Sequence, residues 1–278
     1  MPLATFRDIL PAANAEGRAV AGLVCLGWED AWAYAQAAED VGAPVILQTG
    51  PGARAHMPLS VWGPLLRTLG ERVSVPVVAH LDHGSSVEEC REALHQGFTS
   101  VMFDGSKLPD EENAALTAEV VRMAHDAGAS AEGEIGFVGY ADGERSAEVS
   151  NPTTPEQAAL LAGTGVDALA VSVGNVHLKT TSDAVIDWDA VGAIRGVTDT
   201  PLVIHGASGV ADADRRRLAR GPVAKFNVGT ELRQVFGRSL REVLEASPDR
   251  FDRVAILRDT MAPIREAAAR VIRELHSP

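Results

Sequence analysis

Short apolar runs alternate along the chain with longer amphipathic stretches. The apolar runs are continuous rather than alternating, which is typical of strands buried on both faces of a sheet. Regular alternation of strands and helices predicts a parallel sheet. The predicted strands are 19–26, 44–49, 76–82, 100–104, 130–135, 167–173, 201–205 and 224–228. The predicted helices are 28–41, 60–73, 86–96, 110–127, 154–164, 188–198, 212–220 and 231–246.

Eight strand–helix repeats favour closure into an α/β TIM (β/α)8 barrel over an open, doubly wound sheet. The length of 278 residues is typical of one such barrel. We therefore expect residues 1–278 to form a single domain, with 251–276 as a helical C-terminal extension. Two long segments, 137–153 and 174–187, follow the fifth and sixth strands, and such loops commonly bind or cover a ligand.

Composition and charge narrow the class of protein. Apolar residues make up 46% of the chain and charged residues 23%, as in ordinary globular proteins. The net charge of −13 argues against nucleic acid as a partner, because that binding relies on Lys and Arg. No signal peptide or membrane span is recognisable. Cys25 and Cys90 lack metal-binding spacing, so a reducing, cytoplasmic compartment is expected.

Three histidines follow three of the predicted strands. His83, His177 and His205 stand where catalytic groups of such barrels gather, at the carboxyl ends of the strands. A single histidine is more often structural than a ligand. Three of them, with carboxylates such as Asp82 beside them, predict a catalytic metal site, because zinc commonly takes three protein ligands. Co²⁺, Mn²⁺ or Fe²⁺ suit the same ligands.

Glycine-containing turns follow the seventh and eighth strands, at 205–209 and 227–230. In (β/α)8 barrels these two loops often bind phosphate through backbone N–H groups and a helix N-terminus. Either turn alone could be an ordinary left-handed turn. Their occurrence in adjacent loops predicts a phosphate site.

Five motifs carry a family resemblance. They are HLDHG (80–84), SVMFDGS (100–106), AEGEIG (131–136), HGASG (205–209) and KFNVGTEL (225–232). In this combination and order the chain resembles the class II, metal-dependent fructose- and tagatose-bisphosphate aldolases, and is more similar to the shorter tagatose type. The resemblance covers nearly the whole chain.

The resemblance implies roles for individual residues. It implies His83, His177 and His205 as Zn²⁺ ligands, and Asp82 as the acid/base on the substrate oxygen. A second acid/base in the loop after the fifth strand matches Asp142, or Glu144 if the loop register shifts. The remaining implied positions are Asp104 and Glu134 at a second metal location; Gly206, Ala207, Ser208, Asn227, Val228, Gly229 and Thr230 at the phosphate; and Arg265, reaching the substrate's far end across a dimer interface.

The implied enzyme is an aldehyde-lyase of carbohydrate metabolism. It would reversibly cleave a phosphorylated ketose to dihydroxyacetone phosphate, or a similar phosphorylated donor, and an aldehyde. A metal acting as Lewis acid would stabilise the enediolate, and a carboxylate would move the hydroxyl proton. The resemblance also implies that the chain forms a homodimer or homotetramer and that a monovalent cation takes part in binding.

Three positions depart from the family pattern. Val24 stands where the first strand usually carries an Asn, Leu178 replaces the Gly that follows the histidine matching His177, and Asp142 replaces a Glu. All three changes fall on substrate-contacting parts, which predicts a non-standard substrate. Two alternatives stay open: another enolate reaction, such as an epimerisation or isomerisation, and a non-catalytic protein that binds metal and phosphate.

Overall fold

The computed structural model describes residues 3–141 and 150–277. Eight parallel strands follow one another around a closed barrel, and pairing of the first strand with the last completes it. The predicted TIM barrel is therefore confirmed. The strands are β1 (Val20–Val24), β2 (Val45–Thr49), β3 (Val77–Gly84), β4 (Ser100–Phe103), β5 (Ser130–Ile135), β6 (Ala168–Val171), β7 (Leu202–Ile204) and β8 (Val223–Val228).

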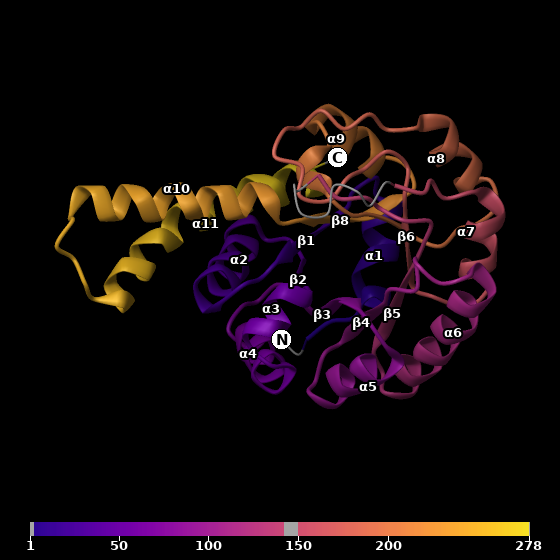
Figure 1. The fold of residues 1–278 in the computed structure, drawn as a ribbon, viewed down its shortest axis with the longest axis horizontal. Helices are drawn as coiled ribbons and strands as arrows, with labels where there is room; N and C mark the ends of the chain where they lie inside the picture. The colour runs from indigo at the N-terminus through magenta and orange to yellow at the C-terminus, as the bar shows by residue number, and fades with distance from the viewer. Residues whose placement is uncertain (1–2, 142–149, 278) are drawn as a thin grey trace.

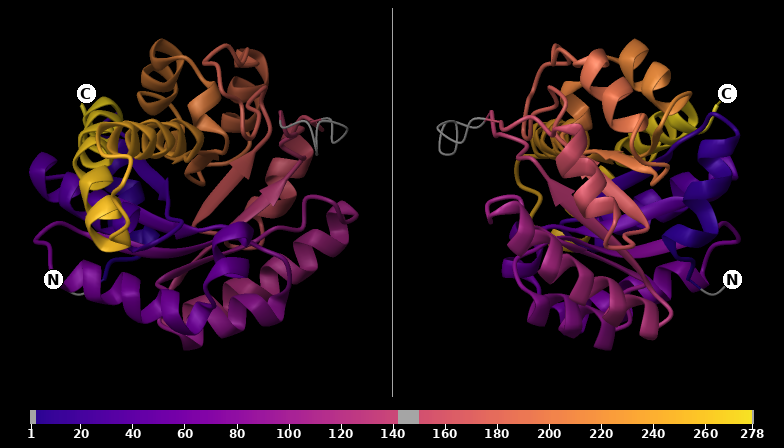
Figure 2. Two further views of the ribbon diagram at one scale, coloured as in Figure 1. Left: turned by 60° about the vertical axis from the view of Figure 1, so that its left-hand side comes forward. Right: turned by 90° about the vertical axis from the view of Figure 1, so that its right-hand side faces the viewer.

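Helices surround the barrel, and the last two extend from it as an arm (Figures 1 and 2). Three helices, α1, α3 and the 3-10 helix η1, are additional to those predicted from the sequence. The helices are α1 (Phe6–Ala15), α2 (Trp28–Val41), α3 (Pro51–His56), α4 (Leu59–Glu71), α5 (Val87–His95), α6 (Asp110–Asp126), α7 (Pro155–Ala162), α8 (Trp188–Arg195), the 3-10 helix η1 (Ala207–Gly209), α9 (Asp212–Ala219), α10 (Thr230–Ala246) and α11 (Arg253–His276).

The inside of the barrel is divided between an apolar and a polar half. At the amino end of the strands, Phe6 and Leu10 of α1 pack in one cluster with inward-facing residues such as Val20, Val78 and Val203. Toward the carboxyl end the buried inward side chains become polar; they include Gln48, His80, Asp82, Glu132, Glu134, His205, Lys225 and Asn227. Burial of so many polar groups requires partners, and those partners form the site.

Among the residues that the structure describes, none of the helices combines the length and hydropathy needed to cross a membrane.

Candidate active site

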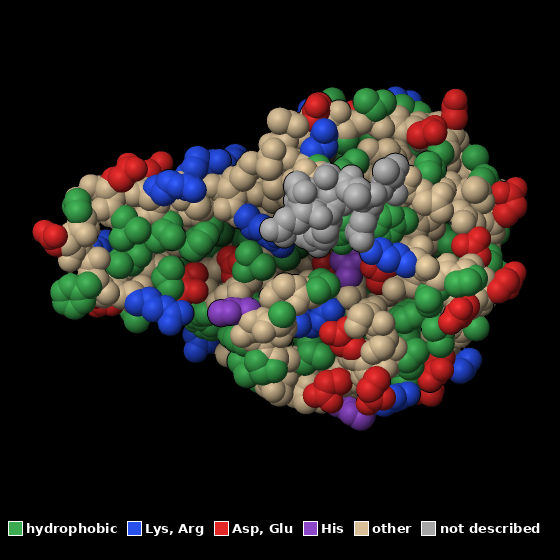
Figure 3. Space-filling view, viewed as in Figure 1, with side chains coloured by type: hydrophobic (Ala, Val, Ile, Leu, Met, Phe, Trp, Pro, Cys, Tyr) green, Lys and Arg blue, Asp and Glu red, His purple; other side chains and the backbone are tan. Residues whose placement is uncertain are grey.

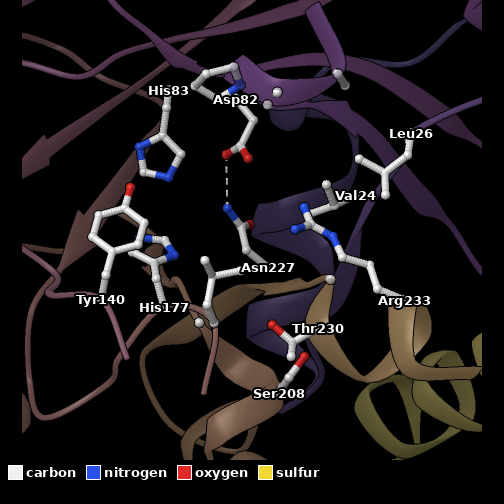
Figure 4. Close-up of a pocket in the computed structure, with 17 residues that line it drawn as sticks. Val24, Leu26, Asp82, His83, Tyr140, His177, Ser208, Asn227, Thr230 and Arg233 are labelled. Carbon is white, nitrogen blue, oxygen red and sulfur yellow. Dashed lines mark hydrogen bonds between the residues drawn. The ribbon is translucent and has the colours of Figure 1, made fainter. Parts of the chain in front are cut away.

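A cavity of about 270 Å³ opens at the carboxyl end of the barrel. Figure 4 shows His83 and His177 on one side of it, with Asp82 pointing toward Asn227 near the centre. Arg233 of α10 enters from the opposite side. The cavity is lined by Val24, Leu26, Gly50, Pro51, Gly52, Ala53, Asp82, His83, Tyr140, His177, Leu178, Gly206, Ser208, Asn227, Gly229, Thr230 and Arg233.

The three predicted imidazole ligands converge. One ring nitrogen from each of His83, His177 and His205 falls in a group whose atoms lie within 4.8 Å of one another. Nε2 of His83 lies 3.0 Å from Nδ1 of His205. His177 stacks on Tyr140, with ring centroids 4.8 Å apart. The loops after β5 and β6 are tied together here, because the backbone N–H of His177 donates to the carbonyl of Gly139 over 2.8 Å.

Two carboxylates stand beside the imidazoles. Asp104 Oδ2 lies 2.7 Å from His83 Nδ1. Glu134 Oε2 lies 3.7 Å from Nδ1 of His83 and of His205, and this buried atom has no hydrogen-bond partner among the described residues. Buried polar atoms rarely stay unsatisfied. A buried, unpartnered carboxylate oxygen beside converging imidazoles therefore fits a divalent metal ion.

The charges around the imidazoles suit metal binding. Burial, and then the charge of His83, hold the pKa of His177 and of His205 well below the ordinary value, which keeps both rings neutral with a free lone pair. Burial alone would lower the pKa of His83, but Asp82, Asp104 and Glu134 raise it to about 10. A cation is thus stabilised at this point of the barrel.

Asp82 is a buried carboxylate that stays ionised. Burial raises its pKa, but the neighbouring His83 and His205 outweigh that effect, and the net pKa is lowered. Asn227 Nδ2 donates to Asp82 Oδ1 over 3.0 Å and fixes its orientation. Asp82 is therefore an oriented proton acceptor on the cavity wall.

Arg54 of α3 holds the carboxyl end of β3, a contact that the sequence did not suggest. Its guanidinium donates to the carbonyls of Thr49 and Asp82 over 2.7 Å each and to that of His83 over 2.9 Å. Glu89 pairs with it at 2.7 Å. His83 adopts a left-handed φ of 53°, which is costly outside glycine and persists only where surrounding contacts hold it.

The two predicted phosphate turns lie side by side on the cavity wall. Gly206 has a φ of 63°, and a Cβ there would lie 2.3 Å from the carbonyl oxygen of Val176, so only glycine fits. The 17-residue helix α10 begins at Thr230, and the N-terminus of a helix favours anions. The N–H of Glu231 in its first turn donates to Ser208 Oγ over 3.2 Å, which joins the two turns. Of the predicted phosphate set, Gly206, Ser208, Asn227, Gly229 and Thr230 line the cavity, while Ala207 and Val228 are fully buried.

Comparison with known proteins shows which family has a sequence like that of this chain. The profile of the family described as fructose-bisphosphate aldolase class-II matches residues 4–278. A Bacillus subtilis (strain 168) protein named as a probable fructose-bisphosphate aldolase is 37% identical over 100% of this chain and 99% of its own length. The chain belongs to the class II fructose-bisphosphate aldolase family. That family is one of aldehyde-lyases, so the prediction of such an enzyme is confirmed.

Solved structures of similar chains share this fold. The YdjI aldolase from Escherichia coli K12 superposes with a TM-score of 0.83 at 29% identity, covering 98% of this chain and 97% of its own. Fructose-bisphosphate aldolase from Campylobacter jejuni has a TM-score of 0.82 at 21% identity, covering 99% and 95%. At that identity the second likeness shows the fold alone.

One predicted site residue, Arg265, lies apart from this aldolase pocket. Asp142, with Glu144, falls outside the described residues. Arg265 lies on α11 and forms a bidentate ion pair with Asp40 of α2, at 2.6 and 2.5 Å; it does not line the cavity. Its role across a subunit interface stays a prediction.

Two positions that depart from the aldolase pattern line the cavity, and one of them lies close to Arg233, a residue that was not predicted from the sequence. Val24 and Leu178 both line the cavity, and Leu178 has a left-handed φ of 56°. A Cβ built on Gly229 would lie 3.0 Å from Val24 Cγ2 and 3.9 Å from Arg233 Nε, so Arg233 passes close to Val24. The Arg233 side chain makes no hydrogen bond or salt bridge with another described residue. Arg233 lies in the first turn of the predicted helix 231–246, just after the phosphate turn, and this position is the signal that could have identified it from the sequence.

Proposed function

We propose that this class II aldolase reversibly cleaves a phosphorylated ketose to dihydroxyacetone phosphate, or a similar phosphorylated donor, and an aldehyde. Zn²⁺ is the proposed metal, held by His83, His177 and His205, because three neutral imidazoles suit it. Asp104 and Glu134 offer carboxylate oxygens at a second position. When bound, the metal supplies Lewis-acid stabilisation of the charge that develops on the substrate carbonyl.

The observation that carries this proposal is the ionised Asp82 beside the imidazole cluster. Its carboxylate faces the cavity and is oriented by Asn227. An ionised carboxylate within reach of the substrate hydroxyl can take its proton as the carbon–carbon bond breaks, and return it in condensation. Asn227 Oδ1 has no hydrogen-bond partner among the described residues, which leaves an acceptor for a substrate hydroxyl.

Anionic groups of the substrate would bind at two places. The two turns that carry Gly206, Ser208 and Thr230 offer backbone donors to a phosphate. Arg233, whose guanidinium points into the cavity without a partner among the described residues, would bind a second anionic group. A substrate with an anion at each end suits this arrangement.

Val24 and Leu178 set the proposed substrate apart from the usual bisphosphate ketoses. Val24 has no hydrogen-bonding group, so it cannot contact a hydroxyl as an Asn would. The side chain of Leu178 occupies space that a glycine would leave to the substrate. We therefore expect a different aldehyde portion, with the phosphorylated donor retained.

The test is a condensation assay with dihydroxyacetone phosphate and a panel of phosphorylated and unphosphorylated aldehydes. We expect a product with the summed carbon count, activity lost on chelation of the metal and recovered with Zn²⁺. Products of unchanged carbon count would instead show an isomerase or epimerase. Full activity on fructose or tagatose bisphosphate would refute the altered substrate.

We further propose that the enzyme is cytoplasmic and forms a homodimer, or a homotetramer built from such dimers. Its two cysteines, Cys25 and Cys90, are free and buried, which suits a reducing compartment. Hydrophobic side chains gather along the arm of α10 and α11 in Figure 3. Phe251 and Val254 are 93% and 73% exposed there, as expected of a surface that a second copy covers. Light scattering would measure the mass; a monomer at micromolar concentration would refute the dimer.

A further inference from the structure

A buried polar network lies inside the barrel next to the metal site. Its members are Glu132 of β5, Lys225 of β8 and His80 of β3, and each is 0% exposed. Lys225 Nζ lies 2.6 Å from Glu132 Oε2 and 3.3 Å from His80 Nε2. None of the three lines the cavity, so none can contact substrate there.

The network reaches the candidate metal ligand His205 through one oxygen. Glu132 Oε1 lies 2.9 Å from His205 Nε2, while the other ring nitrogen of His205, Nδ1, faces His83 Nε2 at 3.0 Å. The two nitrogens of this imidazole thus have separate surroundings. One faces the buried carboxylate, and the other faces the converging ligands.

Donor and acceptor chemistry settles where the protons lie. An ammonium has only donors, so Lys225 donates to Glu132 and to Nε2 of His80, whose Nδ1–H then donates to Ser100 Oγ over 2.9 Å. An ionised carboxylate has only acceptors, so His205 must carry its proton on Nε2. Its Nδ1 then carries the lone pair and faces the converging ligands, 3.0 Å from His83 Nε2.

We propose that the Glu132–Lys225 pair, supported by His80, positions His205 as a metal ligand by fixing its tautomer and ring orientation. The inference rests on the proposed metal-dependent function. A carboxylate that accepts the second N–H of a ligating imidazole is a general means of orienting it and raising its basicity. Lys225 balances the charge of Glu132, so the carboxylate stays fixed between its two donors.

Packing alone does not account for this pair. Buried ion pairs are commonly replaced by apolar residues of similar volume without loss of stability, whereas removal of one partner leaves a costly unpaired charge. The double variant Glu132→Met/Lys225→Met is therefore expected to fold, and it deletes the contact to His205. Ser100→Ala is the matched control, because it alters the same buried network at a point that touches neither Glu132 nor His205.

The experiment measures metal affinity and tautomer without substrate. Zn²⁺ affinity is determined by competition with a chromophoric chelator, and the His205 tautomer by ¹⁵N NMR of the metal-free protein. For Glu132→Met/Lys225→Met we expect affinity to fall about 10- to 100-fold and both tautomers of His205 to appear. Ser100→Ala should bind Zn²⁺ within about twofold of the parent, because His80, Lys225 and Glu132 separate Ser100 from His205.

A second variant, Glu132→Gln, tests the proposal if the double variant does not fold. In Glu132→Gln one amide oxygen must serve both His205 and Lys225, and we expect affinity to fall at least about threefold. Unchanged affinity together with an unchanged Nε2–H tautomer, in whichever variant folds, would overturn the proposal. If the parent protein binds no metal at all, the proposed metal-dependent function fails instead, so the two failures are distinguishable.

Discussion

The two sides of the cavity are built differently. On the metal side, His83 and Asp82 are held by hydrogen bonds from several strands, and even their backbone carbonyls accept from Arg54. On the opposite side, Val24 offers only methyl groups, and Arg233 reaches across from a helix without a hydrogen-bond or salt-bridge partner among the described residues.

This difference suggests that one side of the cavity carries out the reaction and the other side recognises the substrate. Groups that must hold a metal and move a proton need fixed geometry, and the strand ends of a barrel supply it. Groups that recognise the remainder of a substrate are completed only when it binds. The metal side therefore indicates aldolase chemistry, while the Arg233 side is compatible with a substrate different from the usual bisphosphate ketoses.

The largest effect is expected from breaking the metal side. In His177→Ala one of the three proposed imidazole ligands is lost, and the several kcal/mol of Lewis-acid stabilisation should go with it. We expect at least about a 10³-fold loss of kcat and less than one metal per chain by elemental analysis. His125→Ala, at an exposed helix position where His125 pairs with Asp167, is the control. Retention of full metal content would remove His177 from the ligand set.

Asp82→Asn should separate proton transfer from metal binding. The amide has nearly the same shape but cannot accept the substrate proton, so kcat should fall about 10²- to 10⁴-fold. Metal content and KM should change little, because the three imidazoles are untouched. Steady-state kinetics with parallel metal analysis would check this, and a kcat close to that of the parent would exclude Asp82 as the base.

The fold was largely predictable because apolar strand runs and amphipathic helices are local patterns. All eight strands lie within one or two residues of a predicted run, as β1 and β3 illustrate. Helix α1 was missed, since its short amphipathic stretch precedes the first repeat and is stabilised by the barrel interior through Phe6 and Leu10. Helix α3 is a single short segment between β2 and α4.

The site divides in the same way. His83, His177 and His205, whose rings converge in the structure, could be selected as candidates from the sequence because each follows a strand. The Glu132–Lys225 pair and the Asp82–Asn227 hydrogen bond join residues 93 and 145 positions apart, so only closure of the barrel brings them together. The loop at 137–153 contributed Tyr140, whose contact with His177 no local pattern indicated.

Arg233→Met tests the opposite side of the cavity. Loss of a charge-assisted hydrogen bond costs about 1.5–3 kcal/mol, so kcat/KM for a substrate with two anionic groups should fall roughly 10- to 100-fold. A substrate lacking the second anion should be unaffected. Arg241→Met, further along α10 and outside the cavity lining, is the matched control. An equal loss of kcat/KM for both substrates would show that Arg233 does not bind the second anionic group.

The smallest effect concerns Leu178, which lines the cavity and follows His177 in the chain. At its φ of 56° any side chain with a Cβ is strained. Leu178→Gly and Leu178→Ala both delete the half-buried side chain, but only Gly also relieves the backbone. We expect the Gly variant to be the more stable by about 1 kcal/mol in chemical denaturation, the reverse of the usual order. A more stable Ala variant would show that the left-handed conformation is not retained at this position. Leu178 would then restrict the substrate only through its side chain.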